Sequence, residues 1–96
     1  MMVLITYDVN TISEDGNKRL RKVSKECLNY GQRVQNSVFE CVLPEAEFIK
    51  LQSKIESIIN PELDSIRFYF LGKNWKRRII TLGRITSYDV TSELII

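Results

Sequence analysis

The order of the apolar patterns is the feature that most constrains the fold of this 96-residue chain. Extended patterns of the kind found in β-strands alternate with two helical periods in the order β-α-β-β-α-β. Strands are predicted at about residues 2–9, 33–36, 38–43 and 64–71, and helices at about 16–30 and 45–59. This order predicts an α+β fold of the ferredoxin-like type, with both helices on one face of an antiparallel sheet.

Local signals support these boundaries. Apolar side chains recur at helical spacing in both helices, as Leu20, Val23, Cys27 and Tyr30 in the first and Phe48, Leu51, Ile55 and Ile58 in the second. Gly31 is predicted to end the first helix in a left-handed turn, and Asn60-Pro61 to end the second. The strand phase changes at Asn36-Ser37, which predicts a tight turn or a bulge there.

The chain is predicted to be a single domain spanning residues 1–96. After a basic loop at 72–78, the patterns predict a strand at Ile79–Leu82 and another within 92–96, so that 84–96 forms a C-terminal extension. A domain of this size buries only roughly 60–65% of its unfolded surface. Because the helices cover one face of the sheet, we expect a second copy of the chain to cover the other, with the extension packed on that partner.

Composition excludes several classes of protein. The absence of histidine removes imidazole as a base or ligand, and with two cysteines it argues against a zinc site. Cys27 and Cys41 each fall on an apolar stripe and are predicted to be buried thiols. No apolar stretch approaches the ~20 residues of a membrane helix, and the first residues do not resemble a signal peptide, so a cytoplasmic protein is expected.

The net charge of +2 conceals two basic segments, residues 16–33 with one acid and residues 72–84 with none. Their basic side chains are Lys18, Arg19, Arg21, Lys22, Lys25 and Arg33 in the first segment, and Lys73, Lys76, Arg77, Arg78 and Arg84 in the second. Uneven placement of this kind indicates a polyanionic partner such as DNA or RNA.

Asp8 ends the first strand pattern and is its only acid. It is either a turn residue at the strand exit or a ligand for a hard cation, Mg2+ or Mn2+. One carboxylate is a weak metal site, but two copies of Asp8 facing each other across a dimer axis could share one ion. Such an ion could activate water for attack on a phosphodiester, and without it the two carboxylates would repel.

The arginines of the first basic segment are candidate phosphate ligands. Arg19, Arg21 and Arg33 could make forked hydrogen bonds with phosphate oxygens, or they could form an ordinary solvated surface. Trp75, among lysines and arginines, either stacks on a base or packs on a lysine stem. Phe39 alternates with core positions, which favours burial or a dimer contact.

Three strings in the order Tyr7-Asp8-Val9, Arg19-Leu20-Arg21 and Gly31 to Glu40 (GQRVQNSVFE) resemble the CRISPR-associated Cas2 family. The resemblance covers about residues 1–71. It implies a homodimer that bridges the CRISPR integrase Cas1 and holds the DNA to be inserted as a new spacer, in defence against foreign nucleic acid. It also implies Mg2+-dependent endonuclease activity on single-stranded RNA or double-stranded DNA. By position, Asp8 would be the catalytic metal ligand, and Arg19, Arg21, Arg33 and Phe39 would support it or bind nucleic acid.

Two other functions are compatible with the composition. The first is a non-catalytic scaffold that bridges integrase subunits and binds duplex DNA through phosphate contacts, with Arg77 and Arg78 as the residues to test. The second is an RNA-binding domain of the RRM type, but the required Gly-Phe-type signature does not occur. Phosphate contacts carry no base information, so the residues do not distinguish RNA from DNA.

Overall fold

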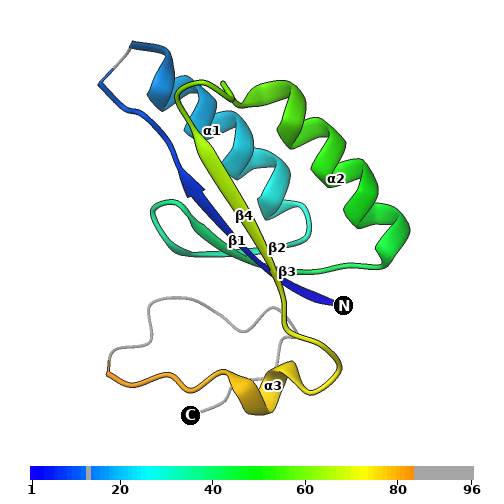
Figure 1. The fold of residues 1–96 in the computed structure, drawn as a ribbon. Helices are drawn as coiled ribbons and strands as arrows, with labels where there is room; N and C mark the ends of the chain where they lie inside the picture. Colours follow the sequence, from blue (N-terminus) through cyan, green and yellow to red (C-terminus); the bar gives the residue numbers. More distant parts are fainter. Residues whose placement is uncertain (13, 84–96) are drawn as a thin grey trace.

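One of the two inner strands of the sheet is β1 (Met2–Asp8), which pairs antiparallel with β3 (Val38–Val42) on one side and β4 (Ser65–Phe70) on the other. The computed structural model describes residues 1–12 and 14–83, and all statements about structure concern these residues (Figure 1). β2 (Gly31–Gln35) pairs with β3, so the strand order is β2-β3-β1-β4. The helices α1 (Glu14–Leu28) and α2 (Glu45–Ile58) form one layer over the sheet. The predicted ferredoxin-like fold is therefore confirmed.

The core lies between the sheet and the two helices, on the faces that the periodicity predicted. It is a single cluster of apolar side chains. Its members include Val3, Ile5 and Tyr7 of β1, Phe39 and Cys41 of β3, Leu20, Val23 and Cys27 of α1, and Phe48, Leu51 and Ile55 of α2. Both cysteines are free and buried, as expected. Tyr30 and Ile58 pack against this cluster but are only partly buried.

Gly31 has a different role from the predicted one. In the described part of the chain the glycines with positive φ are Gly72 and Gly83, so Gly31 makes no left-handed turn. It is the first residue of β2, and a Cβ atom there would lie 1.8 Å from the backbone oxygen of Glu40. Glycine is thus required because β2 and β3 approach closely, and the prediction of a left-handed helix end was wrong.

The connection between β2 and β3 contains both features expected at the phase change. Asn36 and Ser37 form a tight turn. The strand pairing also shifts register between Arg33 and Gln35, since Arg33 is opposite Phe39 while Gln35 is opposite Val38. This bulge and turn bring the β2–β3 connection beside the end of β1, where the backbone N–H of Tyr7 donates to the carbonyl of Ser37 at 2.9 Å.

The segment after β4 departs from the prediction. A short helix, α3 (Trp75–Arg78), lies within the predicted basic loop, apart from the α1–α2 layer (Figure 1). Ile79–Leu82 forms no strand, and Ile80 and Leu82 are 82% and 88% exposed. The strand prediction was wrong because an extended segment needs a neighbouring strand to pair with, and none adjoins it in the described part of the chain. The strand predicted within 92–96 and the extension 84–96 lie outside the described residues.

None of the helices within residues 1–12 and 14–83 is long and apolar enough to cross a membrane.

Candidate functional site

Asp8 is the last residue of β1 and projects away from the helices. Alternation along the strand turns Tyr7 toward α1 and α2, where it is 2% exposed, and turns Asp8 to the opposite, solvent-exposed face. Its Cα partner on the neighbouring strand is Ser65, the first residue of β4. The strand end therefore presents one carboxylate to solvent, as the sequence predicted.

An open depression of about 420 Å3 adjoins this carboxylate. Besides Asp8, its lining includes four residues with oxygen-bearing side chains, Thr6, Thr11, Asn36 and Ser37, the last two from the β2–β3 turn. The other lining residues are Tyr7, Val9, Leu20 and Val38. Oxygen ligands and room for water suit Mg2+, which keeps several waters in protein sites. Among the described residues, however, no three His, Cys, Asp or Glu side chains come together. One chain thus fits a hydrated ion only as a partial site.

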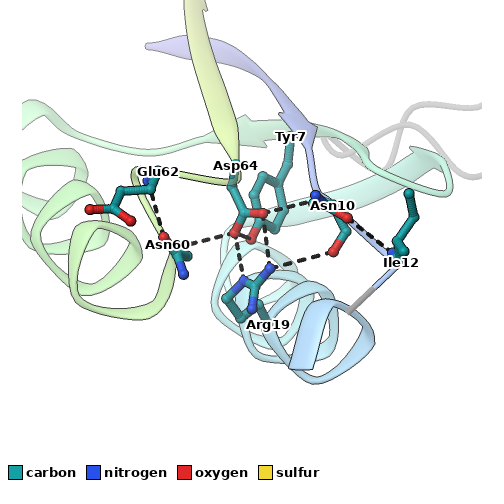
Figure 2. A network of polar contacts seen from close by, with 7 residues as sticks. All are labelled: Tyr7, Asn10, Ile12, Arg19, Asn60, Glu62 and Asp64. Carbon is teal, nitrogen blue, oxygen red and sulfur yellow. Dashed lines mark hydrogen bonds and ion pairs between the residues drawn. The ribbon is translucent and has the colours of Figure 1, made fainter. Parts of the chain in front are cut away.

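On the helix side of the same strand end, a buried aspartate collects hydrogen bonds from several segments. Figure 2 shows Asp64 at the centre of this network. Its carboxylate accepts from the hydroxyl of Tyr7 at 2.6 Å, from Arg19 Nε at 2.6 Å and Nη2 at 3.1 Å, and from the backbone N–H groups of Asn10 at 3.0 Å and Asn60 at 3.1 Å. The Asp64 side chain is fully buried, so these bonds replace its hydration.

The network shifts the pKa values of two of its members, Asp64 and Tyr7. Burial alone disfavours the charged form of Asp64, but the hydrogen bonds from Arg19, Tyr7 and the two backbone N–H groups outweigh it and hold the pKa of Asp64 well below its ordinary value. Burial, reinforced by the bond to the Asp64 carboxylate, raises the pKa of the Tyr7 phenol. At neutral pH the pair therefore consists of a carboxylate and a neutral phenol.

Arg19 belongs to this network, which argues against its predicted role as a nucleic-acid ligand. Its guanidinium forms a two-pronged ion pair with Asp64, its side chain is only 12% exposed, and Nη2 also reaches the carbonyl of Asn10 at 3.4 Å. A guanidinium held in this way has few donors left for a phosphate. Sequence reasoning missed Asp64 entirely. The available signal was a single acid at the first position of the strand predicted at 64–71, where burial is possible.

Phe39 is buried, as its alternation with core positions predicted, which argues against the nucleic-acid contact that the family resemblance implies. It is fully buried in the core, so it has no face on which a base could stack. Arg33 lies over its ring, with 5.4 Å from the guanidinium carbon to the ring centroid. An Arg33 N–H also donates to the hydroxyl of Ser24 on α1. Phe39 and Ser24 thus orient Arg33, which remains exposed, as does Arg21.

The second basic group lies in and around α3. Lys73, Arg77 and Arg78 are exposed, and the ammonium of Lys76 lies 5.8 Å from the ring centroid of Trp75, so the tryptophan packs against a lysine. The structure does not bring this group to Asp8. Leu71, just after β4, bonds to the carbonyl of Met2, at the opposite end of β1 from Asp8, and α3 follows from there.

Known proteins with similar sequences and folds were found by three comparisons. The family model described as CRISPR associated protein Cas2 matches residues 1–79. The chain is 51% identical over 96 residues to a CRISPR-associated endoribonuclease Cas2 of Chlorobaculum tepidum, with both chains fully covered. It is 52% identical over 95 residues to a CRISPR-associated endonuclease Cas2 of Halalkalibacterium halodurans, covering 99% of each.

Among solved structures, the crystal structure of Streptococcus pyogenes Cas2 at pH 6.5 is 61% identical and superposes with a TM-score of 0.80. That match covers 86% of this chain and all of the other. A second structure, titled crystal structure of cas2, is 34% identical with a TM-score of 0.69 and covers 100% of this chain and 98% of its own.

Proposed function

The chain belongs to the CRISPR-associated Cas2 family, and on that basis we propose that it is a metal-dependent endonuclease of CRISPR adaptation. Its substrates are single-stranded RNA or double-stranded DNA. It acts on them in the cytoplasm. The relatives are named endoribonuclease or endonuclease. The observation that carries the proposal is the exposed Asp8 carboxylate at the end of β1, beside an open depression that several hydroxyl- and amide-bearing residues also line.

The active form is a homodimer, in which the two copies of Asp8 would hold one Mg2+ or Mn2+ ion. The described residues of one chain supply a single carboxylate to the depression and no cluster of three acidic or other metal-binding side chains, so a second copy is needed to complete the site. When bound, the ion supplies Lewis-acid stabilisation of phosphate charge and activates water.

The remaining residues bind and orient the substrate. Arg33, held by Phe39 and Ser24 at a fixed place on the surface, and Arg21, exposed on α1, contact the phosphates. Since the chain contains no histidine, no imidazole is available to act as a base.

The test is cleavage by Asp8→Asn, which keeps the size of the side chain and removes its charge. We expect loss of Mg2+-dependent cleavage of both RNA and DNA substrates while the dimer stays folded, because the carboxylate holds the ion. Glu56→Gln removes one exposed negative charge from α2 and is the matched control, expected to cleave like wild type. Cleavage by Asp8→Asn at the wild-type rate would refute the proposal.

A second function is favoured by the exposed basic side chains around α3, remote from Asp8. In this function the dimer is a scaffold that bridges subunits of the integrase Cas1 and holds duplex DNA through phosphate contacts from Arg77 and Arg78. Cleavage and scaffolding use different residues, so one dimer can do both.

Charge reversal tests the scaffold. We expect Arg77→Glu with Arg78→Glu to weaken duplex binding and to flatten its dependence on salt concentration, because fewer counterions are released. Lys50→Glu with Lys54→Glu reverses the same number of exposed charges on α2 and serves as the control. Equal DNA affinity for the two double variants at every salt concentration would exclude phosphate binding by Arg77 and Arg78.

A further inference from the structure

We propose that Asp64 is a positioning residue for Asp8: it holds the end of β1 from the helix side of the sheet and thereby fixes the direction of the metal-binding carboxylate on the other side. The inference rests on the proposed function of Asp8. It assigns a role to a buried acid that neither binds substrate nor faces the depression.

Asp64 forms hydrogen bonds with residues on both sides of Asp8 in the sequence. Its carboxylate accepts from the Tyr7 hydroxyl at 2.6 Å and from the Asn10 N–H at 3.0 Å, and only Asp8 and Val9 lie between those two residues (Figure 2). Asp64 also directly precedes Ser65, the Cα partner of Asp8 in the β1–β4 ladder. The backbone at Asp8 is therefore restrained by the bond to Tyr7 before it, by the bond to Asn10 after it, and by its pairing with Ser65 on β4.

Strand geometry carries this restraint through the sheet. Neighbouring side chains on a strand project to opposite faces from one backbone, so holding Tyr7 on the inner face sets the direction of the Asp8 Cα–Cβ bond on the outer face. No hydrogen bond from the described residues reaches the Asp8 carboxylate itself. Its placement before an ion binds thus depends on the backbone that Asp64 holds.

Arg19 keeps Asp64 ionised and holds its carboxylate toward the end of β1. The guanidinium makes two hydrogen bonds to the carboxylate, and a third to the carbonyl of Asn10, so it ties α1 to the same end of β1. A buried ion pair is weak evidence for stability, whereas a carboxylate with five donors from four segments restricts orientation. Metal sites depend on such supporting shells for ligand geometry.

The experiment compares two Tyr→Phe variants that each remove one tyrosine–carboxylate hydrogen bond. Tyr7→Phe removes the bond to Asp64. The control Tyr30→Phe removes the 3.0 Å bond to Glu47, which joins the α1–β2 turn to α2 and does not hold β1. Mn2+ is titrated into each full-length protein without nucleic acid and followed by electron paramagnetic resonance. We expect the Kd for Mn2+ to rise about tenfold in Tyr7→Phe, the size of effect typical of supporting residues around metal ligands. In Tyr30→Phe it should remain at the wild-type value.

Thermal unfolding of both variants separates positioning from stability. The inference is supported if the two lose similar stability but only Tyr7→Phe loses Mn2+ affinity, with the KM for nucleic acid unchanged. It is overturned if Mn2+ affinity in Tyr7→Phe equals that in Tyr30→Phe while wild type binds and cleaves normally. Failure of wild type to bind Mn2+ in an Asp8-dependent way would instead overturn the proposed function itself, and this inference with it.

Discussion

Single side chains in this protein acquire their roles from partners that lie far away in sequence. Asp64 and Arg19 are separated by 45 positions, yet their ion pair and the Tyr7 hydroxyl form the most connected polar group in the described residues. Phe39 occurs in the string that carries the family resemblance, and its role is to support Arg33 from within the core. A residue's membership in a motif therefore does not by itself reveal whether it touches substrate.

The pH dependence of stability follows from Asp64. Its pKa is lower in the folded than in the unfolded chain, where it is about 3.9. The stabilisation is therefore complete above the unfolded value and is lost as pH falls through about 4 toward the folded value. We expect the free energy of unfolding, measured by urea denaturation, to fall steeply between about pH 5 and pH 2.

The same titration in Asp64→Asn identifies the source of that slope. This variant should have a lower free energy of unfolding at pH 7, by about 1–3 kcal/mol, because the amide cannot accept all of the buried hydrogen bonds that the carboxylate accepts. It should also lose less stability on acidification than wild type. If the free energy of unfolding of Asp64→Asn fell with pH as steeply as that of wild type, other carboxyl groups would be the source of the acid sensitivity.

At the scale of elements, the end of β1 is defined by what adjoins it on each side. The β2–β3 turn reaches it through the bond between Tyr7 and Ser37, and the start of β4 lies across from Asp8. β2 itself can approach β3 only because Gly31 lacks a side chain. The geometry of the depression near Asp8 thus depends on a close strand contact at the other end of the same hairpin.

Gly31→Ala tests this contact. The added Cβ would meet the Glu40 carbonyl oxygen at 1.8 Å, and backbone cannot move aside as a flexible side chain can. We expect a loss of about 2–4 kcal/mol in the free energy of unfolding, within the range of strongly destabilising substitutions. Gly72→Ala is the comparison: its φ of +79° is strained for alanine but its surroundings are open, so about 1 kcal/mol is expected. Equal losses would show that β2 can shift to accept the methyl group.

At the scale of the whole molecule, the proposed activity needs two chains. The described residues of one chain contribute a single exposed carboxylate to the depression. Two such carboxylates brought together would repel each other without a cation between them. Assembly and metal binding should therefore be coupled, since an ion that binds only the dimer stabilises it by mass action.

The coupling is measurable as a monomer–dimer equilibrium. We expect sedimentation equilibrium to give a tighter wild-type dimer in Mg2+ than in EDTA, by several-fold. In Asp8→Asn the repulsion and the ion site are both removed, so the dimer should be as tight in EDTA as in Mg2+. A metal effect of equal size in both proteins would place the ion elsewhere.

Much of this architecture follows from local patterns of residues, which the sequence by itself determined. The spacing of apolar residues sets which face of each helix or strand is buried, and the order of those patterns is sufficient for the ferredoxin-like fold. The position of Asp8 at an exposed strand end follows from the same alternation. These features need only neighbouring residues, because periodicity is a property of a few consecutive turns or strand positions.

The tertiary structure alone decided which polar groups meet. Nothing near Asp64 in the sequence indicates that it accepts hydrogen bonds from Tyr7, Asn10 and Arg19. The same is true of Gly31, which must be glycine because of a carbonyl on another strand. It is also true of Ile79–Leu82, which has no strand beside it among residues 1–12 and 14–83. Hydrogen bonds, close contacts and strand pairing depend on the distance between segments in space, and that distance exists only once the chain has folded.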